Sequence, residues 1–268
     1  RRELDMVFSF QHMECDQYYV KWLKRKFRPK VFFDCLTQWQ RELDWNALYL
    51  ENHDQPRSIP RFGSVRYWKE SGKLLATLLL TLRGTPFLYQ GQEIGMLDFD
   101  FQRIRQLNDV ESKNVDRLLR RFHVPQKLRW RIISRTSRDN ARTPFQWDDG
   151  PQAGFSQGRP WLGVNHNCAS INLAQQEEDP ASIWNWYKDL AALRREREVL
   201  RRGEFVPMEA APPLFAYRRR LGEEQLTVLL NFSDDPARVS VQGSLLRSNY
   251  PRARFEGVLQ PWEAVILE

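Results

Sequence analysis

Polar, hydrogen-bonding side chains follow three separate apolar runs in this sequence, an arrangement suited to binding hydroxyl groups and moving protons. The runs and the polar residues after them are Leu4–Phe10 with Gln11, His12 and Glu14, Trp45–Tyr49 with Asn52, His53 and Asp54, and Thr85–Tyr89 with Gln90, Gln92 and Glu93. Polar groups at the end of a buried strand are costly unless they have partners. In parallel α/β proteins the active site lies at the carboxyl ends of the strands. The pattern therefore predicts a concave polar site at three strand ends, and solvent-facing polar residues at separate ends are the alternative.

The segments between these runs predict helices that carry the chain from one strand to the next. Val31–Leu43 places apolar residues at helical spacing, and Tyr67–Leu82 is an apolar segment of helical length that Gly84 is expected to cap. An order of strand, helix, strand, helix, strand requires parallel strands with crossover helices. The sequence therefore predicts an α/β fold in which the three apolar runs are buried strands.

The segment 97–178 is polar and irregular, and it is too long to be a simple connection. One helix is expected within it, near Val115–Phe122. A segment of this length in a compact domain usually builds a site or covers one. A further helix is predicted to begin with Asp179 as its N-cap and Pro180 as its first residue, and to end near Arg197.

The character of the sequence changes after Gly203, where prolines become frequent and strand patterns replace helical ones. The expected strands are Leu214–Arg219, Gln225–Phe232, Arg238–Val241 and Ala264–Leu267, of which the first two form a hairpin. The sequence therefore predicts two domains. Residues 1–203 form the first, and residues 204–268 form a small antiparallel β domain.

The composition favours a folded protein of the cytoplasm. The chain has 268 residues, of which 41% are hydrophobic, and this is enough for one large core and a small second domain. Its three cysteines, Cys15, Cys35 and Cys168, have unrelated spacings that predict reduced thiols and neither a disulfide nor a zinc site. The longest apolar run, around Leu74–Leu82, is too short to span a bilayer, and the start of the chain shows no secretory signal.

The net charge is +7, and basic residues are densest at Lys21–Lys30 and Arg117–Arg135. A basic face can bind nucleic acid or an anionic surface. A solvated face is the favoured interpretation, because acidic residues are interspersed elsewhere, and no nucleic-acid partner is expected. Salt-sensitive retention on DNA would support the nucleic-acid alternative.

Three longer motifs occur in order along the chain, ENHDQPRSIPRFG, GTPFLYQGQEIGM and SRDNARTPFQWDDGPQAGF. In these motifs the sequence resembles the second half of α-amylase-family α-glucosidases (glycoside hydrolase family 13). The resemblance is to the oligo-1,6-glucosidase and dextran glucosidase type, with trehalose-6-phosphate hydrolases nearby. It extends from about Glu3 to Tyr217 and is weaker in the final segment.

The resemblance implies a (β/α)8 TIM barrel followed by a β domain, with the three apolar runs as about strands 6–8. The first five strands would then be missing, and with them the nucleophilic Asp, the acid/base Glu and any calcium site of the family. A chain that starts with Arg1 rather than Met fits the C-terminal half of a longer enzyme. We therefore expect this chain alone not to hydrolyse glycosides.

By the same resemblance, Asp54 is the carboxylate that binds and distorts a sugar ring carrying positive charge at its anomeric carbon and ring oxygen. His53 binds a hydroxyl of that sugar, and Asn52 belongs to the same substrate-binding group. A loop-capping Asp54 and a structural His53 are the alternatives. Arg142 is expected to reach the sugar hydroxyls and pair with an active-site carboxylate, with Arg138 as its rival and a surface salt bridge as the alternative.

The resemblance also implies residues that meet the leaving-group sugar. Lys21 and Glu111 match charged residues of the 1,6-specific branch, and ordinary surface charges are the alternative for both. Phe10, Tyr89 and Phe145 are candidates for stacking on sugar faces, although packing in the core is the favoured interpretation for each.

The function implied is the release of terminal glucose from short α-glucosides, preferably 1,6-linked, by a retaining double displacement without cofactor or metal. An α-1,4-glucosidase and a trehalose-6-phosphate hydrolase are the alternative enzymes. A non-catalytic carbohydrate-binding relative, such as a transporter subunit, is the alternative of another class. The intact Asn52-His53-Asp54 and the lack of an expected membrane span argue against it. The expected partners are small α-glucoside oligosaccharides.

Overall fold

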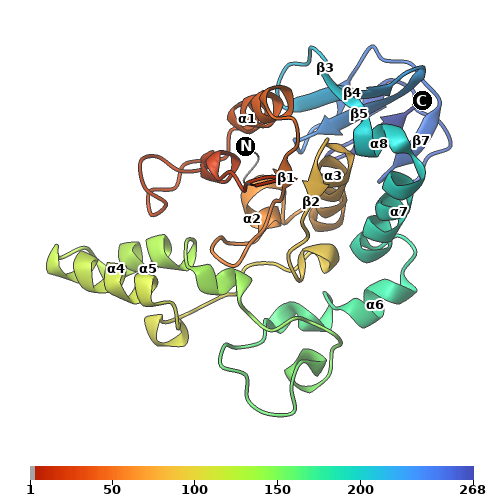
Figure 1. The fold of residues 1–268 in the computed structure, drawn as a ribbon. Coiled ribbons are helices and arrows are strands. Elements are labelled where there is room, and N and C mark those ends of the chain that lie inside the picture. The colour runs from red at the N-terminus through yellow and green to blue at the C-terminus, as the bar shows by residue number, and fades with distance from the viewer. Residues whose placement is uncertain (1–3) are drawn as a thin grey trace.

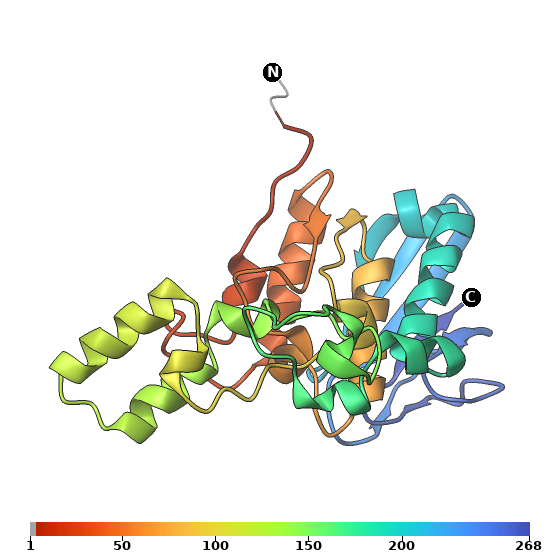
Figure 2. The same cartoon turned by 90° about the horizontal axis from the view of Figure 1, so that it is seen from below.

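The computed structural model describes residues 4–268, and residues 1–3, with which the predicted barrel portion begins, lie outside the described residues. Helices and very short strands make up the part before residue 204, and an antiparallel sheet follows it (Figure 1). Helices α4 (Val110–Arg121) and α5 (Gln126–Ser134) form a hairpin that projects from the body of the molecule in both views (Figures 1 and 2).

The two crossover helices predicted from the sequence are confirmed. The helices of the described chain besides α4 and α5 are α1 (Pro29–Glu42), α2 (Ser58–Phe62), α3 (Trp68–Thr81), α6 (Leu173–Glu178), α7 (Ile183–Glu196) and α8 (Glu198–Arg202). Single turns of 3₁₀ helix lie at Gln11–Glu14, Gln92–Ile94, Ile104–Gln106, Arg138–Ala141, Pro151–Gly154 and His166–Ala169. Helices α1 and α3 begin and end within two residues of the predicted bounds.

The second and third apolar runs form parallel strands, as predicted, but the strands are short. Strand β1 (Ala47–Leu48) pairs in parallel with β2 (Thr85–Pro86), and Ala47 lies opposite Thr85. The prediction that Gly84 caps α3 is wrong, because Leu82 holds that position. Gly84 has a φ of +139° and lies so close to β1 that a Cβ would stand 2.2 Å from the carbonyl oxygen of Asn46. Glycine is therefore required where the two chains approach.

The first apolar run is not the buried strand that the sequence predicts. Leu4–Phe10 makes no strand, and most of its large apolar side chains are half exposed or more, with Leu4 at 69% and Phe8 at 50%. Strands need a paired neighbour to satisfy their backbone groups, and within residues 4–268 no strand pairs with this segment. Its contacts are made by side chains instead. The Phe8 ring packs edge-on against Tyr49 and Phe87.

Helix boundaries in the long polar segment also differ from the prediction. Helix α4 begins after Asp109, earlier than the predicted Val115, and α5 and α6 were not expected. Asp179 ends α6 and does not cap α7. The N-cap of α7 is Ser182, whose side chain accepts a hydrogen bond from the backbone N–H of Asn185. Tyr187, Leu190 and Leu193 of this helix are buried, and Trp184 is partly buried.

The C-terminal segment forms a five-stranded antiparallel sheet in the order β3-β4-β5-β9-β7. The strands are β3 (Glu204–Pro207), β4 (Leu214–Leu221), β5 (Glu224–Asn231), β7 (Leu245–Ser248) and β9 (Ala264–Leu267), with a separate pair formed by β6 (Ala237–Arg238) and β8 (Val258–Leu259). The predicted hairpin and the last predicted strand are confirmed as β4–β5 and β9. The strand predicted over Arg238–Val241 is wrong beyond Arg238, where the pairing with β8 ends.

One hydrophobic core joins the sheet to the helices. The Phe33 ring of α1 stacks on Phe215 of β4 at a centroid distance of 4.6 Å. Arg219 of β4 is fully buried and donates hydrogen bonds to the carbonyl oxygens of Thr81, Leu200 and Gly203. These carbonyls lie at the ends of α3 and α8, where the helix itself leaves them without partners. The sheet therefore holds in place the helices that position β1 and β2.

Among residues 4–268, no helix has both the length and the apolar character required to cross a membrane.

Candidate active site

The stretch after β1, LENHDQPR, contains a buried ion pair between Glu51 and Arg57. The Glu51 Oε2 atom lies 2.9 Å from Nη1 of Arg57, and the two side chains are 2% and 0% exposed. The other Glu51 oxygen accepts hydrogen bonds from the backbone N–H and the hydroxyl of Ser58, at 2.8 and 2.7 Å. Both oxygens of this carboxylate are thus used inside the protein, which is what a buried charge requires.

Arg57 also links this strand end to the next one. Its Nη1 donates to the carbonyl oxygen of Gln90, just beyond β2, at 2.7 Å. Its backbone N–H donates to Oδ1 of Asp98 at 2.8 Å. Burial raises the pKa of the Asp98 carboxyl to about 6, with the Arg57 contacts acting in the opposite direction. The two strand ends are therefore fixed to each other by a buried guanidinium.

Asp54 lies outside this buried layer and faces two arginines. Its Oδ1 accepts a hydrogen bond from Nη2 of Arg142 at 2.9 Å, and Nη1 of Arg138 approaches the same oxygen at 3.4 Å. Nε2 of His53 lies 3.4 Å from the other oxygen, Oδ2. The Asp54 side chain is 43% exposed. One carboxylate oxygen is thus held by guanidinium groups, the other lies beside His53, and the side chain as a whole is partly exposed.

Backbone contacts around Asp54 fix its direction. The Asp54 N–H donates to the side-chain oxygen of Asn52 at 2.8 Å, which closes a tight Asx-type turn. Nε of Arg142 donates to the carbonyl oxygen of His53 at 2.8 Å. Arg142 therefore binds both the turn and the carboxylate on it. Its guanidinium donates from two nitrogens in a fixed geometry, which a lysine ammonium cannot reproduce.

Arg138 has a different anchor from Arg142. Its Nη2 and Nε donate to Oδ1 of Asp109 at 2.6 and 3.0 Å. Asp109 is buried and is the N-cap of α4, where its side chain also accepts from Ser112. Burial alone would raise the pKa of Asp109, but the hydrogen bonds from Ser112 and Arg138 outweigh it and hold that pKa below its ordinary value. The hydrogen bond to Asp109 likewise raises the pKa of Arg138.

The structure also brings Lys21 and Glu111 together, although 90 residues separate them in sequence. Nζ of Lys21 lies 2.5 Å from Oε2 of Glu111, and Nε of Arg138 is 3.8 Å from the same oxygen. Both side chains are partly exposed. A chain of charges therefore runs from Lys21 through Glu111 and Arg138 to Asp54.

A cavity of about 310 Å³ opens beside Asp54. It is lined by Phe8, Phe10, Tyr49, Glu51, Asn52, His53, Asp54, Phe87, Leu88 and Tyr89. A lining that combines aromatic rings with hydrogen-bonding groups suits a sugar, which has apolar ring faces and polar edges. Phe145, by contrast, is only 8% exposed and packs on Trp147, so it belongs to the core.

The polar residues after the other two runs have structural contacts instead. His12 is buried, its Nε2 lies 2.9 Å from the carbonyl oxygen of Tyr49, and burial lowers its pKa to about 4. Gln11 accepts a hydrogen bond from the Trp39 indole. Gln92 donates to the Tyr187 hydroxyl. Of the three strand ends predicted to form the site, only the end of β1 therefore remains a candidate, together with the residues that contact it.

Sequence reasoning missed Asp109, Glu51 and Arg57. Asp109 carries a usable signal, because an Asp immediately before an amphipathic helix is a preferred N-cap. The Glu51–Arg57 pair has no such signal in the sequence. The cost of burying a charge indicates that each residue has a partner, but it does not identify that partner. Within residues 4–268, no three His, Cys, Asp or Glu side chains gather into a group that could hold a metal ion.

Comparison with known proteins agrees with this arrangement. Residues 1–203 match the family described as the catalytic domain of alpha amylase. Oligo-1,6-glucosidase of Parageobacillus thermoglucosidasius is 41% identical to this chain, over 98% of the chain and 50% of that protein. The solved structures of trehalulose synthase MutB from Pseudomonas mesoacidophila MX-45 and trehalose-6-phosphate hydrolase TreA from Bacillus licheniformis superpose with TM-scores of 0.93 and 0.91, at 33% and 36% identity. Each superposition covers 99% of this chain and 51% of the other.

The parallel strand pair, its crossover helices and the antiparallel sheet are the C-terminal part of a (β/α)8 barrel and the small β domain that follows it. The chain belongs to the alpha-amylase family. It spans about half the length of the curated relatives it matches.

Proposed function

We propose that this chain supplies one half of the active site of a retaining α-glucosidase that releases terminal glucose from short, preferably 1,6-linked, α-glucosides. The observation that carries the proposal is the partly exposed carboxylate of Asp54, beside His53, at the edge of an aromatic-lined cavity. The names of the relatives support it, since oligo-1,6-glucosidases and a glucan 1,6-alpha-glucosidase are among them.

In this proposal Asp54 binds the hydroxyl groups next to the anomeric carbon, and it does so most strongly when the ring becomes an oxocarbenium-like ion. Retaining glycosidases place two further carboxyl groups about 5–5.5 Å apart on either side of the bond that breaks. Those two groups are not supplied by the described residues near Asp54. Arg142 holds Asp54 in position and offers its own N–H groups to the sugar, and a preorganised site of this kind avoids reorganisation during reaction.

Lys21 and Glu111 are proposed to contact the sugar that leaves. Their pair lies at the far end of the charge chain from Asp54, joined to it through Arg138. A 1,4-linked glucoside and trehalose 6-phosphate are the alternative substrates. We further propose that residues 1–203 and 204–268 are separate domains, supported by the start of β3 at Glu204. The odd number of cysteines at unrelated spacings supports a cytoplasmic location.

The test is hydrolysis by the full-length protein of isomaltose, maltose and trehalose 6-phosphate, with proton NMR of the first product. We expect isomaltose to be cleaved fastest and α-glucose to appear before its β anomer. Inverted β-glucose as first product, or turnover of none of the three, would contradict the proposal. Residues 1–268 alone are expected to be inactive on p-nitrophenyl α-glucoside, and turnover at an ordinary enzyme rate would refute that part.

A further inference from the structure

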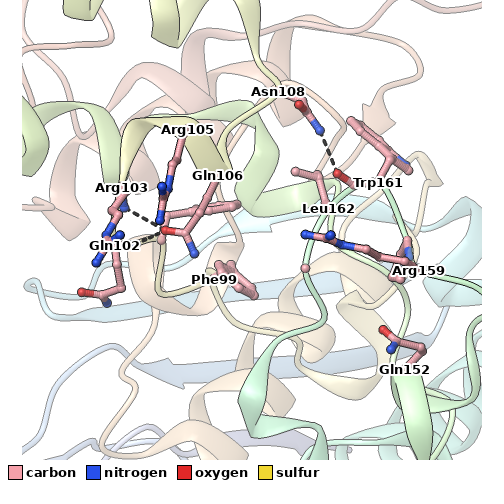
Figure 3. A pocket seen from close by; sticks show the side chains of 13 residues that line it. Phe99, Gln102, Arg103, Arg105, Gln106, Asn108, Gln152, Arg159, Trp161 and Leu162 are labelled. Atoms are coloured by element: carbon pink, nitrogen blue, oxygen red, sulfur yellow. Dashed lines mark hydrogen bonds between the residues drawn. The ribbon is translucent and has the colours of Figure 1, made fainter.

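A second cavity of the described chain is separate from the Asp54 site and has the opposite charge character. It has a volume of about 1030 Å³ and is formed by two segments, 99–108 and 152–163 (Figure 3). None of its lining residues lines the cavity beside Asp54. Three arginines line it, namely Arg103, Arg105 and Arg159, and its lining contains no Asp or Glu.

These guanidinium groups are not engaged elsewhere. All three side chains are exposed, and among residues 4–268 none of them forms an ion pair or donates a hydrogen bond. Figure 3 shows Arg103 and Arg105 on one side of the cavity and Arg159 on the other, with Phe99 between them. Three like charges around one hollow repel one another, and a bound anion removes that repulsion. The planar guanidinium fork also matches the oxygens of a phosphate group.

The cavity offers groups for a sugar as well as for an anion. The Trp161 side chain is 65% exposed and lies on the Arg159 side of the cavity (Figure 3). The exposed amide of Gln152 also lines the cavity. Gln152 itself has a φ of +54°, a left-handed conformation that non-glycine residues rarely adopt. An exposed indole and an exposed amide suit the apolar face and the hydroxyl edge of a saccharide.

The walls of the cavity are held in place by the protein core and by the active-site scaffold. Phe99, Phe101 and Leu162 belong to one buried hydrophobic cluster beneath it. The Asn108 amide donates to the carbonyl oxygen of Trp161 at 2.8 Å and so ties the two segments together. The next residue, Asp109, anchors Arg138. The cavity is therefore a formed feature that adjoins the proposed active site.

We propose that this cavity is a second saccharide site, which binds a phosphorylated sugar through Arg103, Arg105 and Arg159 and stacks its ring on Trp161. The saccharide part of the ligand rests on the proposed function, whereas the phosphate part rests on the arginines alone. A phosphate monoester is favoured over a carboxylate because its three terminal oxygens can accept hydrogen bonds from more than one guanidinium at once.

The test is calorimetric titration of the full-length protein, in 150 mM salt, with glucose 6-phosphate, inorganic phosphate, glucuronate and glucose. We expect glucose 6-phosphate to bind at least about tenfold more tightly than each of the others, since it alone uses both the arginines and the indole. Equal affinity for inorganic phosphate would overturn the assignment to a sugar phosphate. Tighter binding of glucuronate would overturn the choice of phosphate, and no binding of glucose 6-phosphate would overturn the site.

Matched variants separate this cavity from general positive charge. The variant Arg103→Gln/Arg105→Gln/Arg159→Gln should bind glucose 6-phosphate about tenfold or more weakly, because charge-assisted hydrogen bonds are lost. The control Arg117→Gln/Arg121→Gln/Arg131→Gln removes the same charge from the exposed α4–α5 hairpin and should change affinity less than about twofold. Equal weakening in both variants would refute a built site.

Two further variants distinguish this proposal from the proposed function. Trp161→Ala should weaken glucose 6-phosphate binding and leave inorganic phosphate binding unchanged. Asp54→Asn should leave glucose 6-phosphate binding unchanged, and a parallel loss would place the ligand in the Asp54 cavity instead. A protein that binds glucose 6-phosphate here but cleaves no α-glucoside refutes the proposed function alone, whereas one that cleaves isomaltose without this binding refutes only the second site.

Discussion

The stretch LENHDQPR contributes to two carboxylate–guanidinium pairs that have the same length and opposite surroundings. Glu51 and Arg57 lie 2.9 Å apart with side chains 2% and 0% exposed. Asp54 and Arg142 also lie 2.9 Å apart, but their side chains are 43% and 25% exposed. The contact distance therefore says nothing about the role of a pair. What differs is how many oxygens the protein itself uses and whether water can reach them.

The buried pair is suited to holding structure and the exposed pair to holding a ligand. Both Glu51 oxygens accept hydrogen bonds from protein groups, so no acceptor is left for a substrate. Asp54 has one oxygen beside His53, and its partly exposed side chain lines the cavity. Breaking a buried pair leaves an uncompensated charge, whereas an exposed pair contributes little to stability. Each of the following changes tests one side of this difference.

The largest effect is expected for Glu51→Ala. This change leaves the Arg57 guanidinium buried without its carboxylate, and it should lower the free energy of unfolding by about 3–5 kcal/mol. Urea unfolding of the full-length protein measures the loss. Asp54→Ala is the matched control and should cost no more than about 1 kcal/mol, because its pair is exposed. Similar losses in the two variants would show that the difference in burial has no energetic consequence.

Asp98 tests the buried layer through its pH dependence. Burial raises its pKa to about 6, so ionisation opposes folding, and stability is lost as the pH rises from about 4, the ordinary carboxyl value, to about 6. Asp98→Asn keeps an acceptor for the Arg57 N–H and removes the charge. Its stability relative to the wild type should therefore increase with pH across this range, by less than about 3 kcal/mol because the Asp98 side chain is partly exposed.

The control for Asp98 is a comparison of the two proteins at pH 4, where both side chains are neutral and their stabilities should nearly agree. Unfolding curves at pH 4, 5, 6 and 7 provide the measurement. A difference that stays constant over this range would mean that Asp98 titrates near its ordinary pKa in the folded protein.

A smaller effect is expected for Arg142→Ala, and it should appear in activity rather than stability. Losing one charge-assisted hydrogen bond to substrate or to Asp54 should lower kcat/KM for isomaltose roughly 10- to 100-fold. Arg142→Lys should recover little of this, because an ammonium group cannot grip both Asp54 and the carbonyl oxygen of His53. Full activity in the lysine variant would show that only the positive charge matters.

Arg138 provides a comparison for Arg142 within the same motif. It approaches Asp54 at 3.4 Å and is held mainly by Asp109 at 2.6 Å. If the two arginines had interchangeable roles, Arg138→Lys and Arg142→Lys would lower kcat/KM by similar factors. We expect Arg142→Lys to have the larger effect, because of the two arginines only Arg142 donates a short hydrogen bond to the Asp54 carboxylate.

Sequence reasoning identified the motif residues of the site but not the contacts that fix them. Asp54 and Arg142 stand in motifs that resemble a known family, so their types could be assigned to a shared site before the structure. The anchoring of Arg138 by Asp109 could not be foreseen, because it joins residues 29 positions apart across the α4–α5 hairpin, of which the sequence predicts only part of α4. The rivalry between Arg138 and Arg142 was left open for the same reason.

The elements that the sequence placed wrongly share a physical cause. A local sequence pattern does not show which other residues of the folded protein an element will contact. Leu4–Phe10 has the composition of a strand, yet a strand also needs a ladder of backbone hydrogen bonds, and within residues 4–268 no strand pairs with it. Asp179 and Ser182 are both good N-cap types. The Asp179 side chain instead pairs with Lys69 and accepts from Ala181, which leaves Ser182 to begin α7.

The most direct test of the account is Asp54→Asn in the full-length protein, measured as kcat and KM for isomaltose. Asn keeps an oxygen that can face Arg142, so the fold and ground-state binding should survive, while the negative charge proposed to stabilise the oxocarbenium-like ring is lost. The expected result is a fall in kcat of roughly 10²–10³-fold with a much smaller change in KM. An unchanged kcat with a raised KM would contradict the account, because Asp54 would then only hold the bound substrate.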